Sequence, residues 1–220
     1  MLKKAIYVLS TVAFISTPVA ASAQFGGLKK LLPGTKGTAS SVNVDTFLVQ
    51  TTESTKYVMA SAILLNEAAS EQPDLRAKKA EIEAIQRSQD VKELEQFKDQ
   101  FRASAKAMSA KGDYVEVLQA NFDKMDAEQK EIVASAAFNF ALGMLMNAQL
   151  AGDLPEALSS IKSDPTQLLQ AGRVKLAGEL IKMQAEGMGT FIGKMPKVLS
   201  IGKVQQPTDA KATKPKPITF

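Results

Sequence analysis

The stretch IVASAAFNFALGMLMNAQLAG, residues 132–152, decides the fold because it can form either a membrane span or a core helix. It supplies 21 uncharged residues between Glu131 and Asp153. At about 1.5 Å per residue, a helix of this length crosses a hydrocarbon layer of about 30 Å. Its apolar character is interrupted by four polar side chains: Ser135, Asn139, Asn147 and Gln149. This composition favours a buried central helix; a constitutive span and a helix that leaves the bundle to enter a membrane are the alternatives.

Small residues within this stretch indicate close packing by neighbouring helices. They are Ala134, Ala136, Ala137, Ala141 and Gly143. Asn139, once buried, needs a hydrogen-bond partner and could fix the register of the bundle.

Upstream, residues 43–70 have the pattern of a helix with one packed face. Asn43 or Asp45 can cap its start, and Pro73 follows its end. The predicted buried positions are separated alternately by four and three residues: Val44, Leu48, Thr51, Thr55, Val58, Ala62, Leu65 and Ala69.

Further helices are predicted between this helix and the opening stretch. Asp74 can cap a second helix that continues to about Met108, with a possible break at residues 88–90. A third covers residues 113–125, and Asp126 can cap the fourth, which contains the opening stretch.

Downstream, Gly152 and Asp153 are predicted to end the fourth helix, and Pro155 to begin a short helix reaching residue 161. Asp164 and Pro165 then start a fifth long helix. Its predicted inner face consists of Leu169, Leu176, Leu180 and Met183. Glycines at 187, 189 and 193, followed by Pro196, are expected to weaken helical order.

Together these segments predict an all-α fold, an antiparallel bundle of about five helical segments over residues 42–204. A basic flexible arm is expected over residues 24–41. Residues 205–220, rich in lysine and proline, are expected to form a disordered tail.

The first 23 residues have the layout of a cleaved secretory signal peptide. Lys3 and Lys4 provide a positive start, residues 5–15 an apolar run, and Ala-Ser-Ala at 21–23 a small-residue cleavage site. The run is too short for a membrane anchor. Export to the periplasm is therefore predicted, with the extracellular space as the alternative.

The chain has no histidine and no cysteine. These absences exclude imidazole bases, thiolate nucleophiles and metal sites built on either residue. No catalytic, cofactor-binding or metal-ligating residues are predicted, and the protein is not expected to be an enzyme.

Charge is unevenly distributed along the chain, with an acidic body between basic ends. Residues 24–41 hold three lysines and no acid, and residues 187–220 hold six lysines and one aspartate. Both ends mix lysine with apolar residues, as helices that rest on a lipid interface do. The candidate membrane or partner surface is Phe25, Leu28, Lys29, Lys30, Leu31, Leu32, Lys194, Lys197 and Lys203.

The sequence thus predicts a non-catalytic exported bundle that binds a protein or another cell-envelope component. An anionic lipid surface is a possible partner, nucleic acid is not expected, and the oligomeric state is left open. The alternative function is a membrane-active protein that inserts the helix at residues 132–152.

Overall fold

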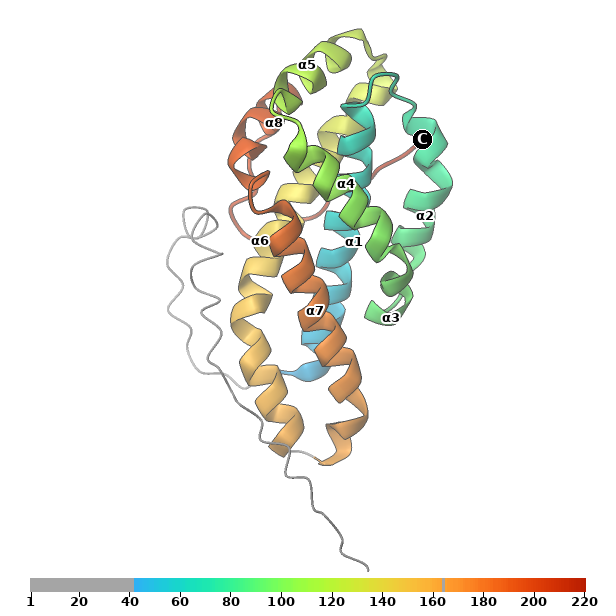
Figure 1. The fold of residues 1–220 in the computed structure, drawn as a ribbon. Helices are drawn as coiled ribbons and strands as arrows, with labels where there is room; N and C mark the ends of the chain where they lie inside the picture. The colour runs from blue at the N-terminus through green and yellow to red at the C-terminus, as the bar shows by residue number, and fades with distance from the viewer. Residues whose placement is uncertain (1–41, 164) are drawn as a thin grey trace, which may run out of the picture.

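The computed structural model describes residues 42–163 and 165–220, and every regular element in these ranges is helical (Figure 1). The α-helices are α1 (Val44–Ala68), α2 (Lys79–Arg87), α3 (Val91–Leu94), α4 (Lys98–Ala110), α5 (Tyr114–Lys124), α6 (Ala127–Ser163), α7 (Ala171–Met188) and α8 (Met195–Ile201). Short 3₁₀ segments connect them: η2 (Leu75–Lys78), η3 (Glu95–Phe97), η4 (Pro165–Gln170) and η5 (Ile192–Lys194). The all-α prediction is confirmed for this part of the chain.

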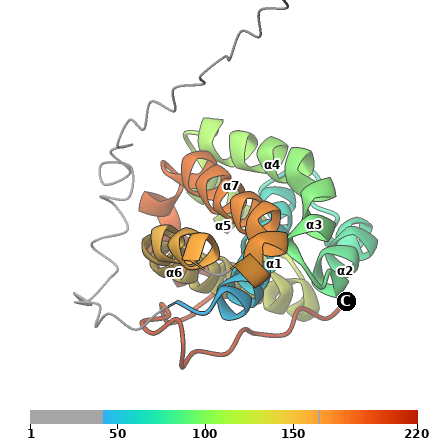
Figure 2. The ribbon, with the colours of Figure 1, turned by 90° about the horizontal axis from the view of Figure 1, so that it is seen from below.

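The core is organised around α6, which packs along α1 while α7 and α8 cover other sides of it (Figures 1 and 2). All eight positions of the predicted seven-residue pattern in α1 are buried. Gly143 allows the two central helices to approach closely, since a Cβ atom built on it would lie 2.9 Å from the Ser54 carbonyl oxygen. The opening stretch is therefore a core helix in this fold.

By length and composition, α6 is also the one helix in the described ranges that could cross a membrane. However, 67% of its most apolar window is buried inside the protein. Packing against α1 and α7 accounts for its apolar character here.

A chain of buried polar side chains joins the three long helices. Asn147 Nδ2 of α6 donates to Gln184 Oε1 of α7 at 2.6 Å, and Gln184 Nε2 donates to Thr55 Oγ1 of α1 at 3.1 Å. Asn147 thus links α6 to α7, and through Gln184 to α1, whereas Asn139 pairs with the backbone of Lys216. That Asn139 fixes the register of the bundle stays a prediction.

Several predicted helix starts are confirmed by their caps. The Thr46 N–H donates to Asn43 Oδ1 at 2.9 Å, and the Ala77 N–H donates to Asp74 Oδ1 at 3.1 Å. At the start of α6, the Gln129 N–H donates to Asp126 Oδ1 at 2.8 Å, and the Asp126 N–H donates back to the Gln129 side chain at 3.1 Å. This reciprocal pair is a capping box.

The predicted end of the fourth helix at Gly152 is wrong. α6 continues through Gly152 and Pro155 as one helix of 37 residues. Its second half packs on α7, where a Cβ atom built on Gly178 would lie 2.9 Å from Leu154. These tertiary contacts outweigh the local tendency of glycine and proline to end a helix.

The prediction that Leu169 faces the core is also wrong, because 92% of this residue is exposed. It belongs to η4, and α7 begins only at Ala171. A 3₁₀ segment has about three residues per turn instead of 3.6, so an α-helical spacing extrapolated across it places side chains on the wrong face.

Helical order weakens after Met188 as predicted, because α7 ends there and a turn and the 3₁₀ segment η5 follow. Regular helix then resumes in α8, whose first turn contains Pro196. Before it, the buried ring of Phe191 packs edge-on against both Tyr114 and Phe140, with centroids 5.0 and 5.6 Å apart. This aromatic cluster holds α5, α6 and the start of the C-terminal region together.

Candidate functional site

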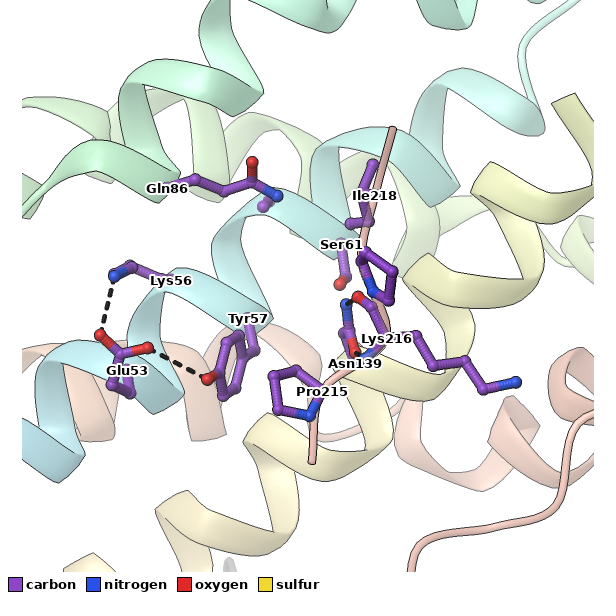
Figure 3. Close-up of a pocket in the computed structure, with 11 residues that line it drawn as sticks. Glu53, Lys56, Tyr57, Ser61, Gln86, Asn139, Pro215, Lys216 and Ile218 are labelled. Atoms are coloured by element: carbon purple, nitrogen blue, oxygen red, sulfur yellow. Dashed lines mark hydrogen bonds and ion pairs between the residues drawn. The ribbon is translucent and has the colours of Figure 1, made fainter. Parts of the chain in front are cut away.

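A cavity of about 420 Å³ lies in a groove beside α1 and α6, under the C-terminal tail (Figure 3). The tail is defined as residues 205–220, which follow α8. It runs past α6 and α1 and ends beside α2 (Figures 1 and 2). The cavity is lined by Glu53, Lys56, Tyr57, Ala60 and Ser61 of α1, Gln86 of α2, Asn139 of α6, and residues 215–218 of the tail.

Asn139 binds the tail backbone through two hydrogen bonds. Its Nδ2 atom donates to the Lys216 carbonyl oxygen at 2.7 Å, and the Lys216 N–H donates to Asn139 Oδ1 at 2.8 Å. The Asn139 amide therefore binds both backbone groups of Lys216, as a neighbouring β-strand would. Because only 4% of Asn139 is exposed, this pairing satisfies an amide that would be costly to leave unpaired.

Side chains of the tail add contacts on both sides of this pairing. The Lys216 ammonium lies 5.2 Å from the centre of the Phe138 ring, a cation–π distance. Ile218 and Phe220 are partly buried and pack against the core, and Pro207 is buried nearer to α8.

The prediction of a disordered tail is therefore not what the structure shows. The tail has the composition of a disordered segment, and seven of its last ten residues are exposed. Its position depends on contacts with α6, about 77 residues away along the chain, and local composition contains no information about those.

One wall of the cavity carries a polar cluster on a single face of α1. Lys56 Nζ donates to Glu53 Oε1 at 2.7 Å, and the Tyr57 hydroxyl donates to Glu53 Oε2 at 3.0 Å. Burial, together with the neighbouring Glu53 carboxylate, raises the pKa of Tyr57 to about 12. The phenol therefore keeps its proton, and its hydrogen bond to Glu53, to a higher pH than an exposed tyrosine would.

Ser61, one turn further along α1, is fully buried at the same wall. Among the described residues its Oγ atom has no hydrogen-bond partner. A buried hydroxyl without a partner is uncommon, and this one lines the cavity beside Asn139 and the tail (Figure 3).

The sequence singled out Asn139 but neither Tyr57 nor Ser61. These two residues lie one turn apart on α1, next to the predicted buried positions Val58 and Ala62. A tyrosine and a serine four residues apart are the one sequence feature that could have indicated a polar site on this face of α1. Nothing in the sequence indicates that this face lies near the tail.

The candidate residues at the basic ends are not part of this groove. Phe25, Leu28, Lys29, Lys30, Leu31 and Leu32 lie outside the described residues. Lys194 is half-buried and donates to the Lys111 carbonyl oxygen at 2.7 Å, whereas Lys197 and Lys203 are exposed. The expected apolar patch around them is not present at the surface, because Phe191, Met195, Val198 and Leu199 point into the core. A partner for the lysines themselves stays a prediction.

Within the described ranges there is no group of three or more acidic residues positioned to hold a metal ion. Comparison of the chain with protein-family models, with curated proteins and with solved structures found no match.

Proposed function

We propose that this chain is a non-catalytic, exported helical binding protein whose groove beside α1 and α6 receives an extended segment of a protein in the cell envelope. The signal-peptide pattern supports export to the periplasm, with the extracellular space as the alternative. In the resting protein, the tail occupies the groove.

The observation that carries this proposal is the paired hydrogen bonding between Asn139 and the backbone of Lys216. Recognition of a backbone N–H and C=O by one side chain is suited to an extended chain, because it mimics the pairing of strands that extended peptides use in many complexes. It requires no particular side chain at the paired residue.

Specificity would come from the contacts on either side of the pairing. Phe138 offers an aromatic face to a cation at the paired position, and the core surface under Ile218 offers an apolar contact two residues later. The expected partner segment is therefore extended, with lysine or arginine at the first of these positions and an aliphatic residue at the second.

Two further features support exchange of the tail for a partner. Most of the final tail residues are exposed, so few contacts must be broken to release them. The cavity also leaves space that the tail does not use.

The test measures binding of a labelled peptide of tail sequence, KATKPKPITF, to variants of the full chain. Lys216→Pro removes both the N–H that donates to Asn139 and the ammonium group over the Phe138 ring, and so weakens the tail's hold on a groove that is itself unchanged. Lys214→Pro is the matched control, because Lys214 makes no hydrogen bond with any other described residue.

We expect Lys216→Pro to bind the peptide at least about tenfold more tightly than the unmodified chain or Lys214→Pro, from the combined loss of one hydrogen bond and one cation–π contact in the tail. Adding Asn139→Ala to Lys216→Pro should remove saturable binding. Equal binding by the two proline variants, or binding that persists without Asn139, would contradict the proposal.

A further inference from the structure

The turn between α6 and α7 presents two neighbouring leucines at one end of the molecule. Leu168 is 60% exposed and Leu169 is 92% exposed. Both lie in η4, at the end where α6 and α7 extend past the start of α1 (Figure 1). Leu158, on the last part of α6, is also 38% exposed. Most large apolar side chains of the described residues are buried, so this concentration at one tip is unusual.

The segment that carries these leucines is basic. Between Glu156 and Glu179 the chain contains Lys162, Arg173 and Lys175 and a single acid, Asp164. Lys162 and Lys175 are exposed, and neither takes part in any ion pair found among the described residues. Arg173 is less available, because its Nη2 lies 3.5 Å from Asp90 Oδ2.

From this arrangement we propose that the α6–α7 turn docks on an anionic phospholipid bilayer. Leu168 and Leu169 enter the boundary between headgroups and acyl chains, while the Lys162 and Lys175 ammonium groups contact lipid phosphates. The charge of the tip is complementary to such a surface. The turn also lies at the very end of the α6–α7 pair (Figure 1), so a bilayer can yield around its two leucines, whereas a folded protein partner would need a matching pocket.

This docking surface is separate from the groove. Along α6, Asn139 and the end of the helix at Ser163 are about 36 Å apart, at 1.5 Å per residue. Failure of lipid docking and failure of peptide binding can therefore be told apart by variants at either place. Two leucines with two lysines predict reversible, salt-sensitive association, unlike the stable insertion of a whole helix.

The experiment is flotation of the purified full chain with vesicles of phosphatidylcholine alone and with vesicles that also contain phosphatidylglycerol. Flotation is expected only with the second kind and should be lost at high salt. Replacing both Leu168 and Leu169 by serine should weaken partitioning about tenfold. Val49→Ser is the matched control, because Val49 is 63% exposed but lies on α1, outside the turn, and it should leave flotation unchanged.

Charge variants separate the tip from the basic C-terminal region. Lys162→Glu with Lys175→Glu should weaken partitioning by about thirtyfold or more, at about 1 kcal/mol for each lysine lost. Lys197→Glu with Lys203→Glu should leave it unchanged. The proposal is overturned if the unmodified chain does not float. It is also overturned if only the Lys197 and Lys203 double variant stops floating, or if Val49→Ser weakens flotation as much as the leucine variant does. It is also overturned if association resists carbonate and ignores the leucine variants, since α6 itself would then be entering the bilayer. If the unmodified chain does not float and the leucine variant has a different oligomeric state, the tip is a protein interface instead.

Discussion

Gly143 of α6 lies so close to Val58 of α1 that no side chain fits between them. A Cβ atom built on Gly143 would stand 2.7 Å from Val58 Cγ2 and 3.1 Å from Tyr57 Cβ. The same two helices form the core of the bundle and carry Tyr57, Ser61 and Asn139 in the groove. The distance between their backbones therefore sets both the packing of the core and the shape of the site.

Gly143→Ala is expected to destabilise the protein by about 1–3 kcal/mol, because the added methyl group overlaps a backbone carbonyl and a buried valine. Gly152→Ala, in the same helix, is the matched control, since a Cβ atom on Gly152 would have no neighbouring atom within 4 Å. It should raise stability by about 0.5–1 kcal/mol through reduced unfolded-state entropy. Urea unfolding measures both changes, and similar effects of the two substitutions would contradict close packing at Gly143.

The buried polar chain predicts coupled effects of Asn147 and Gln184. Gln184→Leu leaves Asn147 Nδ2 without its acceptor and should cost about 1–3 kcal/mol. Adding Asn147→Leu removes the orphaned amide, so the double variant should lose less stability than the sum of the single losses. A double-mutant cycle measured by denaturant unfolding checks this, and simple additivity would show that the two amides do not depend on each other.

Tyr57 predicts a loss of stability in alkali. Its pKa is raised from 10.0 to about 12 in the folded chain. Below pH 10 the phenol is protonated in both the folded and the unfolded states, and its contribution is fully present. As the pH rises from 10 to 12, the unfolded chain loses this proton while the folded chain retains it, so unfolding becomes more favourable.

Tyr57→Phe removes this titrating group and should make stability fall less steeply between pH 10 and 12. The measurement is the urea midpoint at a series of pH values, with the slope at neutral pH as the internal reference. The same alkaline slope in the variant and the unmodified chain would mean that Tyr57 ionises equally well in both states.

The sequence predicted those parts of the fold that depend on local periodicity. In α1, alternating spacings of four and three identified eight buried positions from Val44 to Ala69. They did not indicate that neighbouring helices bury every residue from Val58 to Leu65. Caps such as Asn43 and Asp126 were also predictable, since their hydrogen bonds link residues three apart.

Features that depend on distant contacts could not be predicted in this way. The continuity of α6 through Pro155 depends on its packing with α7. The exposure of Leu169 has a local cause instead, because η4 is a 3₁₀ segment and the predicted spacing is that of an α-helix. For the site, the need of Asn139 for a partner was predictable, but its partner Lys216 was not. The composition of the tail indicates how little apolar surface it can bury, and not which groove accepts it.

The most direct test of the central claim is amide hydrogen exchange at Lys216 in the full chain. Pro215 and Pro217 have no N–H, so the Lys216 signal is isolated from immediate neighbours. Pairing with Asn139 predicts exchange about tenfold or more slower at Lys216 than at Lys214, and loss of this protection in Asn139→Ala but not in Ser61→Ala. Equal exchange at Lys214 and Lys216 in the unmodified chain would show that the groove does not hold the tail, and the proposed recognition of extended segments would lose its basis.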